Sequence, residues 1–391
     1  MKDNLANASP TSGARLAEFR FLCAVINESA GTQQRPNPAD VSDWSRLLRT
    51  ADGLAVLPAL YSGLQRLEFA AAVPDPQLEY MAAAYELNRD RNLRLVSQVT
   101  EFVPVLAEKS IKTVLLKGAA ALASGLYRDP GSRLLSDIDV LVNADDLEAT
   151  AEAFYQLGYR FMLPGSGGYS PATIEAGLRY ETYHHDLAGL MHPDYPAAIE
   201  VHRHSGSPAS RRLLSGDTIL RDAVSVRYDD VDMLVPSIRH RIIHNFNHCQ
   251  IQNLNHRYIT TMPRDLYDFV LQLDDAGSSA IQDEIQTQMA QSDVATEFST
   301  FLYRARYFFG LHLTSEIKPW SLPWWHLRVG ILFIRAPPVA RLFRTLVAAV
   351  FFPVKLCPSQ VLWRNPGMSL PVAYAVSFER LLRRMGLKRS L

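Results

Sequence analysis

The sequence predicts an α+β fold, in which a mixed sheet with flanking helices lies between two helical regions. Residues 14–110 carry apolar side chains at three- and four-residue intervals, without the alternation of strands. Short aliphatic runs typical of strands then follow, and helical spacing returns after Pro236. We therefore expect an N-terminal helical region over residues 1–110, a core over 111–235, and a C-terminal helical, basic region over 236–391.

The composition is that of a globular chain with ample material for a core. It has 391 residues, of which 48% are hydrophobic. Its three cysteines, Cys23, Cys249 and Cys357, are scattered, which argues against a disulfide framework and against a zinc site. Residues 1–12 are polar and lack the apolar stretch of a signal peptide. We expect a cytoplasmic protein.

The charge is unevenly distributed along the chain. The formal net charge is zero, yet the segment from Ile317 to the end has twelve Lys and Arg against one acid. Within it, residues 324–358 are strongly apolar but are interrupted by basic residues and prolines. The longest uncharged run there, residues 345–354, is shorter than the roughly 20 residues of a spanning helix. This predicts no transmembrane segment, and either a packed helical subdomain or peripheral contact with RNA or a membrane surface.

The core elements follow from local patterns. Residues 113–116 predict a strand that ends at the Lys117-Gly118 turn, followed by a helix over 119–126. Residues 137–142 predict a second strand. The next four residues, with Asn143 as cap and two acids, start a helix over 147–157 that Gly158 ends.

The second half of the core is expected to form further strands. Residues 159–163 predict a strand, and residues 165–168 a loop of small residues. Residues 180–191 and 197–204 predict a hairpin through the turn-forming connection between them.

Two pairs of polar side chains, each pair two residues apart on a predicted strand, indicate a metal site. Asp137 and Asp139 are two apart on a strand and share one face, and paired carboxylates call for a cation such as Mg²⁺ or Mn²⁺. Glu200 and His202 share a face on a later strand in the same way. If the two strands are neighbours, three carboxylates meet at one point, and the chemistry expected is phosphoryl or nucleotidyl transfer.

The order of these motifs resembles the uncharacterised nucleotidyltransferase-like family of the polymerase-β superfamily. The resemblance is strongest over residues 114–204, and it rests on the following positions: Lys117-Gly118, Tyr127, Gly131, Arg133, Asp137-Ile138-Asp139-Val140-Leu141-Val142, Gly158-Tyr159 and Glu200-Val201-His202. It implies a polymerase-β-like core and transfer of a nucleoside monophosphate from an NTP such as ATP to a hydroxyl. It also implies roles for single residues. Asp137, Asp139 and Glu200 would bind the metal, and Lys117, Gly118, Arg133 and Ser136 would lie near the triphosphate.

The sequence departs from the superfamily pattern in two places. Ala119 stands where a serine or a second glycine is usual, and Gly118 precedes Asp137 by nineteen positions, more than in minimal members. Neither change removes a metal ligand. They motivate the alternative of a degenerate fold that binds a nucleotide or a partner protein without turnover.

Several residues have a second interpretation. His202 is expected to orient a carboxylate or to move a proton, with His185 a weaker candidate for the same role, and the other histidines are expected to be structural. Arg133 would contact phosphate or merely pair with an aspartate. Asp265 would face the cleft or lie on a surface helix. The function expected is Mg²⁺-dependent nucleotidyl transfer to RNA, a protein or peptide, or a small molecule.

Overall fold

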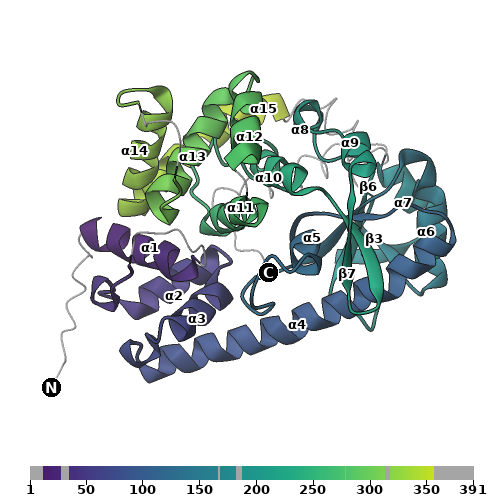
Figure 1. Ribbon diagram of the computed structural model, residues 1–391, viewed down its shortest axis with the longest axis horizontal. Coiled ribbons are helices and arrows are strands. Elements are labelled where there is room, and N and C mark those ends of the chain that lie inside the picture. Colours follow the sequence, from purple (N-terminus) through teal and green to yellow (C-terminus); the bar gives the residue numbers. More distant parts are fainter. Residues whose placement is uncertain are drawn as a thin grey trace.

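The computed structural model confirms the α+β class, with a mixed sheet between helical regions (Figure 1). It describes residues 12–27, 35–165, 168–181, 187–277, 279–312 and 318–355.

One eight-stranded sheet forms the centre of the described structure. Its spatial order is β4-β3-β5-β6-β2-β1-β8-β7. The β2/β6 and β1/β8 pairs are parallel and the other pairs are antiparallel. The strands are β1 (Val114–Leu115), β2 (Asp137–Leu141), β3 (Arg160–Gly165), β4 (Gly168–Ala172), β5 (Leu190–Met191), β6 (Ala198–His202), β7 (Val224–Tyr228) and β8 (Val231–Val235).

Helices of the first hundred residues lead to the sheet. The long helix α4, of 34 residues, runs along the lower edge of Figure 1 from the N-terminal helices to the far side of the sheet. These elements are α1 (Ser12–Ile26), η1 (Pro38–Asp40), α2 (Trp44–Gly53), α3 (Leu57–Arg66), η2 (Ala70–Ala72) and α4 (Asp75–Glu108).

Shorter helices connect the strands, and a longer set follows the last strand. The connecting helices are α5 (Lys117–Ala123), η3 (Ala144–Asp146), α6 (Leu147–Gln156), α7 (Ile174–Glu181), α8 (Pro208–Leu213) and α9 (Gly216–Arg221). The C-terminal set is α10 (Ile238–Phe246), the π-helical turn η4 (Asn247–Gln252), α11 (Pro263–Ala276), α12 (Ser279–Ala290), α13 (Ala295–Phe309), α14 (Leu322–Arg335) and α15 (Pro337–Lys355).

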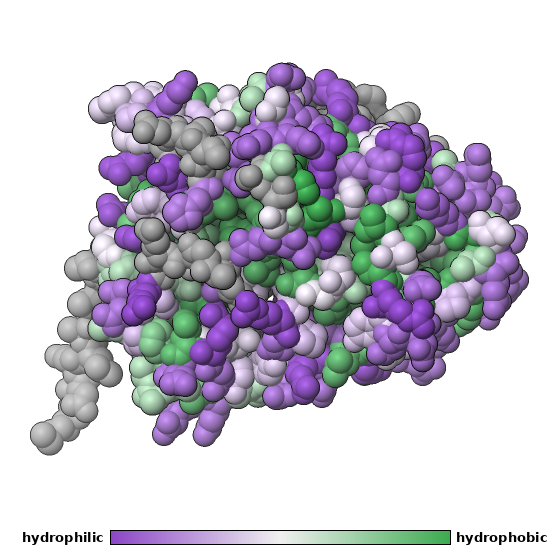
Figure 2. Space-filling view, viewed as in Figure 1, coloured by the Kyte–Doolittle hydropathy of each residue, from purple (hydrophilic) through white to green (hydrophobic). Residues whose placement is uncertain are grey.

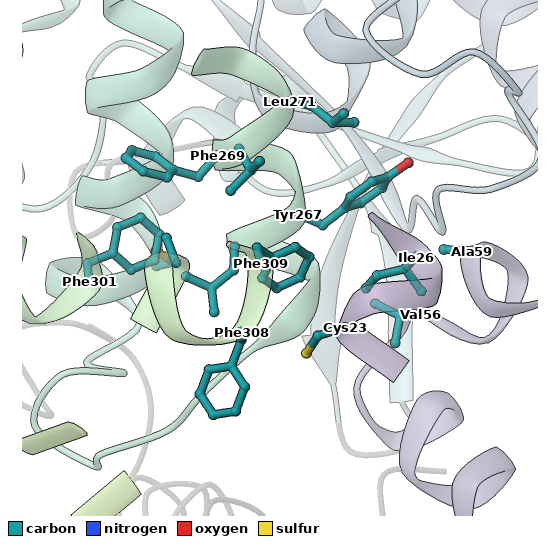
Figure 3. Packing of buried hydrophobic residues seen from close by; sticks show 14 of the residues in the cluster. Cys23, Ile26, Val56, Ala59, Tyr267, Phe269, Leu271, Phe301, Phe308 and Phe309 are labelled. Carbon is teal, nitrogen blue, oxygen red and sulfur yellow. The ribbon is translucent and has the colours of Figure 1, made fainter. Parts of the chain in front are cut away.

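Two hydrophobic cores stabilise the described structure. The first packs α4, α5 and α6 against one face, where Ile138, Val140 and Val201 are fully buried. The second joins the N-terminal helices to the C-terminal ones, with Phe19 of α1 and Phe308 of α13 in edge contact at 5.1 Å between ring centroids. Figure 3 shows this second core, in which residues of the N-terminal helices and residues of α11 and α13 point toward one another. The division into residues 1–110, 111–235 and 236–391 stays a prediction.

The predicted hairpin over residues 180–191 and 197–204 is only partly correct. β5 and β6 do pair antiparallel. Residues 180–181, however, end helix α7, and residues 182–186, which include His185, lie outside the described structure. Helix α7 packs closely on β3. A Cβ on Gly177 would lie 2.0 Å from the Phe161 ring, so only glycine at this position lets the helix approach the strand this closely.

Three strands were not expected from the sequence. The first is β4. The predicted loop at residues 165–168 contains the end of β3 and the start of β4, where Gly165 pairs with Gly168. The hairpin β7/β8 extends the other edge of the sheet, and its turn places Asp229 at a φ of 49°.

The charged C-terminal region forms packed helices as far as the structure describes it. α14 contacts α1 and α13, and α15 contacts α14. None of the helices in the described ranges combines the length and the apolar character that crossing a bilayer requires, in agreement with the sequence. Contact with RNA or a membrane surface stays a prediction.

Candidate active site

The two predicted acidic strands are direct neighbours. β2 and β6 run parallel, and Asp139 pairs in register with Glu200. Because successive side chains of a strand point to opposite faces, Ile138 and Val140 enter the core under α4 and α6 while Asp139 points to the other face. Glu200 and His202 point the same way on β6. One ligand atom from each of Asp139, Glu200 and His202 lies within 4.8 Å of the others.

Asp139 is the centre of this group. Its side chain is almost fully buried, and its Oδ1 accepts a hydrogen bond from Lys117 Nζ at 2.6 Å. Nε2 of His202 lies 2.8 Å from the same oxygen and 3.9 Å from Oε2 of Glu200. His202 is thus within hydrogen-bond distance of Asp139 and lies close to Glu200 as well.

The charges of the group strongly perturb one another. Burial alone would raise the pKa of Asp139, but the charge of Lys117 and the hydrogen bond from His202 outweigh it and hold the pKa far below its usual range. Burial and the charge of Asp139 raise the pKa of Glu200 to about 7. Burial opposes the charged form of Lys117, yet Asp139 raises the pKa of the ammonium above its usual value. Asp139 and Lys117 are therefore an ion pair, beside a carboxyl that ionises less readily.

The donor set suits a divalent cation. Asp139 and Glu200 supply the carboxylate oxygens that Mg²⁺ and Mn²⁺ prefer, and an imidazole nitrogen is acceptable to Mn²⁺. Lys117 occupies one oxygen of Asp139 in this structure, so a cation would compete with the ammonium for that oxygen.

Asp137 lies at the start of β2, on the same face as Asp139. Its Oδ1 accepts a hydrogen bond from Ser136 Oγ at 3.0 Å, and both residues line the cleft. The charge of Asp137 contributes to the raised pKa of Glu200. The ligand atoms that lie within 4.8 Å of one another come from Asp139, Glu200 and His202, and a metal-binding role for Asp137 stays a prediction.

Helix α4 holds the segment that leads into β2. Asn88 donates to the carbonyls of Gly131 and Arg133, at 2.8 and 3.1 Å. Asn92 donates to the carbonyl of Arg133 at 2.7 Å and to that of Pro130 at 2.6 Å. Both asparagines are buried, so their amides satisfy the carbonyls of a segment that lacks regular structure.

Arg91, one turn away on α4, completes this support. It donates from Nε to the carbonyl of Leu135 at 3.1 Å and from Nη2 to that of Ser136 at 2.8 Å. Helix α4, predicted only as part of the N-terminal helical region, thus supports the backbone just before Asp137.

The predicted glycine turn is the first turn of α5. Lys117 has a φ of 47°, unusual for a residue with a side chain, and this conformation accompanies the contact of its ammonium with Asp139. A Cβ on Gly118 would lie 2.0 Å from Cδ2 of Leu135. Glycine therefore lets the segment before β2 pack directly on this helix.

These groups line a cleft of about 370 Å³ between the sheet and the helices α10 and α11. From the core it receives Lys117, Gly118, Arg133, Ser136, Asp137, Asp139 and Glu200. From the C-terminal helices it receives Arg241, His244, His248, Arg264 and Asp265, among others. The second set shows that the helical region after residue 236 forms one wall of the site.

Comparison with known proteins is consistent with this geometry. The family model of an uncharacterised nucleotidyltransferase matches residues 40–310. The chain belongs to this family. The match covers the sheet, all of α4, and the helices through α13, so the family extends well beyond residues 114–204. A search of curated proteins finds no match.

At the edge of the cleft, Arg133 has a partner that the sequence did not identify. Its Nε and Nη2 donate to the carboxylate of Asp268 on α11, the latter at 2.7 Å. Tyr127 donates to the same carboxylate at 2.9 Å. This buried network joins the core to the C-terminal helices. Pairing with an aspartate, the simpler interpretation of Arg133, is what the structure shows; contact with a nucleotide stays a prediction.

Other residues of the cleft wall were predicted to have structural roles or were left with two interpretations. Asp265 is buried and lines the cleft, as one of its two interpretations had it. His244 lines the cleft and contacts the Ser205 carbonyl through Nε2 at 3.1 Å; burial and the charge of Lys117 lower its pKa to about 4. His240, His244 and His248 recur every four residues, and this spacing was the available signal that one helix face turns toward a common surface.

Proposed function

We propose that this protein is a divalent-metal-dependent nucleotidyltransferase that moves a nucleoside monophosphate from an NTP to a hydroxyl acceptor. The observation that carries the proposal is the in-register pairing of Asp139 with Glu200, which gathers two carboxylates and His202 within 4.8 Å. Membership in the nucleotidyltransferase family supports the reaction class. The acceptor, RNA, a protein or peptide, or a small molecule, is not named by the family.

Asp139, Glu200 and His202 would hold Mg²⁺ or Mn²⁺, with Asp137 beside them at the cleft. When bound, such a cation supplies positive charge that stabilises the oxygens around the transferring phosphorus. Lys117, once displaced from Asp139, places an ammonium where a triphosphate oxygen would lie. Ser136 and the first turn of α5 at Gly118 offer hydrogen-bond donors at the same end of the cleft. His202 orients Asp139 through Nε2 and lies 3.9 Å from Glu200.

The experiment is a transfer assay with three proteins. Wild type, Asp139→Asn and Asp145→Asn are incubated with each α-labelled NTP, Mg²⁺ or Mn²⁺, and a cell lysate that supplies acceptors. Asp145 is exposed in the turn after β2, so its variant is a matched loss of one carboxylate outside the cleft. Labelled product is expected with wild type and Asp145→Asn, and a loss of at least about 100-fold with Asp139→Asn.

Unfolding curves accompany the assay, because Asp139→Asn leaves the buried Lys117 ammonium without its partner. Full transfer by a folded Asp139→Asn protein would refute the assignment. Sensitivity of the product to ribonuclease or to protease then identifies the acceptor class.

A binding protein without turnover is the second candidate. The 2.6 Å pair between Lys117 and Asp139 favours it, because an ammonium neutralises the oxygen that a metal would need. Ala119 removes a hydroxyl from the same turn. Saturable NTP binding with no labelled product, under every metal and lysate condition, would support this candidate over transfer.

A further inference from the structure

A second cavity, of about 400 Å³, lies outside the candidate active site. It is enclosed by α1, α2, the segment 259–261, α14 and α15. Four of its lining residues are arginines from three helices: Arg15 of α1, Arg46 of α2, and Arg341 and Arg344 of α15. Glu18 is the one acid among its lining residues, so the wall carries a clear positive excess.

Glu18 does not compensate this excess. It is buried, and it accepts hydrogen bonds from Arg46 Nε at 2.8 Å and from the Ser42 hydroxyl at 2.9 Å. Among the ion pairs of the described residues, none involves Arg15, Arg341 or Arg344. Three guanidinium groups therefore face this cavity without a carboxylate from the described chain.

A further cation is buried directly behind the cavity wall. Arg304 is 1% exposed, and a Cβ on the wall residue Gly330 would lie 3.6 Å from its Nη2. It donates to the Thr260 carbonyl at 2.7 Å and to Nδ1 of His326 at 3.2 Å, while its Nε has no hydrogen-bond partner in the described structure. A buried guanidinium beside other cations is costly unless an anion lies near it.

A third pocket shares lining residues with both the cavity and the active-site cleft. This pocket, of about 360 Å³, shares Asn253, Arg264 and Asp265 with the cleft. At its other end the pocket shares Thr260 and Arg344 with the arginine-lined cavity. Its remaining lining, Asn255, Tyr258 and Met262, is mostly polar. The three pockets are thus neighbours, in the order cleft, connecting pocket and arginine-lined cavity.

We infer that the arginine-lined cavity is an acceptor subsite that binds a phosphate or phosphodiester group. Guanidinium groups match phosphate oxygens in charge and in their forked geometry. An acceptor anchored there extends along the connecting pocket and presents its hydroxyl at Asp139 and Glu200. The acceptor is therefore a phosphorylated molecule. This assignment of substrate class rests on the proposed transferase function; the anion site itself does not.

The first test measures binding without catalysis. Inorganic phosphate is titrated into the full-length protein by calorimetry in chloride buffer. The variants are Arg341→Gln, the pair Arg341→Gln/Arg344→Gln, and the control Arg335→Gln. Arg335 is exposed at the end of α14 and does not line the cavity. Since several charge-assisted hydrogen bonds are removed, the double variant should bind phosphate at least about tenfold more weakly, and Arg335→Gln as wild type does.

Asp139→Asn separates this site from the active site. If it binds phosphate as wild type does, the subsite stands even where transfer fails. Phosphate binding that the arginine changes leave intact, or no phosphate binding by folded wild type, overturns the subsite. Arg341 is exposed and has no described ion pair, so its single variant keeps the test valid if the double variant unfolds.

The second test addresses the acceptor. The lysate of the transfer assay is treated beforehand with phosphatase, with nuclease, or with neither, and the treating enzymes are removed. Loss of labelling after phosphatase alone indicates a small phosphorylated acceptor, and loss after nuclease indicates RNA. Labelling that survives both treatments overturns the acceptor assignment. Weaker ATP binding by the arginine variants would also overturn the acceptor assignment, because it would mean that the NTP binds in this cavity.

Discussion

The ammonium of Lys117 lies 2.6 Å from Oδ1 of Asp139, the same oxygen that His202 contacts at 2.8 Å. One carboxylate oxygen thus has two partners that a divalent cation would have to displace or share. Lys117 has a φ of 47° and lines the cleft together with Asp139. Lys117 and the cation therefore compete for Asp139, and this competition can be measured.

Lys117→Met should lower stability without metal and strengthen metal binding. Removing one partner of a buried ion pair costs about 3 kcal/mol, and the remaining charge on Asp139 then attracts a cation more strongly. Urea unfolding with and without excess Mn²⁺ measures both effects, and Mn²⁺ should restore most of the lost stability. The control is Lys112→Met, because Lys112 is exposed. Equal response of both variants to Mn²⁺ would show that no competition exists.

The contact between Arg133 and Asp268 predicts a second effect on stability. Asp268→Asn leaves the buried guanidinium without its carboxylate and should cost about 3–5 kcal/mol. Tyr127→Phe removes one hydrogen bond to the same carboxylate and should cost about 1 kcal/mol. Urea unfolding of both single variants and the double variant gives the coupling energy. Additive costs would mean that Tyr127 does not stabilise the protein through the Asp268 carboxylate.

The sequence predicted the strands of Asp139 and Glu200 well because their signal is local. Alternation of apolar and polar residues placed Ile138 and Val140 in the core and Asp139 on the opposite face, as the structure has them. The register of Asp139 with Glu200 could only be posed as a condition, since strand pairing depends on contacts between distant segments.

The missed features depend on tertiary contacts. Asp268 lies on an amphipathic helix whose pattern gives no sign that one acid pairs with Arg133, 135 residues earlier. The π-helical turn at residues 247–252 and the hairpin β7/β8 were also missed. In β7 and β8 only Met233 and Val235 are buried, so the alternation there is weak.

Asn92→Ala should lower both stability and transfer. Asn92 is fully buried, and its amide satisfies the carbonyls of Pro130 and Arg133 in the segment before β2. Leaving these groups with fewer partners should cost about 1–3 kcal/mol, and a looser segment should misplace Asp137. Asp90→Ala is the control, because Asp90 is exposed on the same helix. Unfolding curves and the transfer assay measure the two effects; unchanged transfer would show that this segment does not position Asp137.

Acid should destabilise the protein through His244. The pKa of this buried imidazole is lowered from 6.5 to about 4, chiefly by burial and next by the charge of Lys117. Between these values the unfolded chain binds more protons than the folded one, so the contribution of His244 is complete above about pH 7 and decreases as the pH falls toward 4. By about pH 5 the loss should reach about 2 kcal/mol.

His244→Gln removes this titration and keeps a donor for the Ser205 carbonyl. The variant should therefore lose less stability than wild type between about pH 7 and about pH 5, although it starts from a lower value. Glu200 has an opposite effect, because its raised pKa of about 7 favours the folded state as the pH falls; it is present in both proteins and cancels in the comparison. His312→Gln, at an exposed position, is the control. Urea unfolding across this pH range measures the difference, and parallel pH profiles for wild type and His244→Gln would show that His244 is not the group responsible.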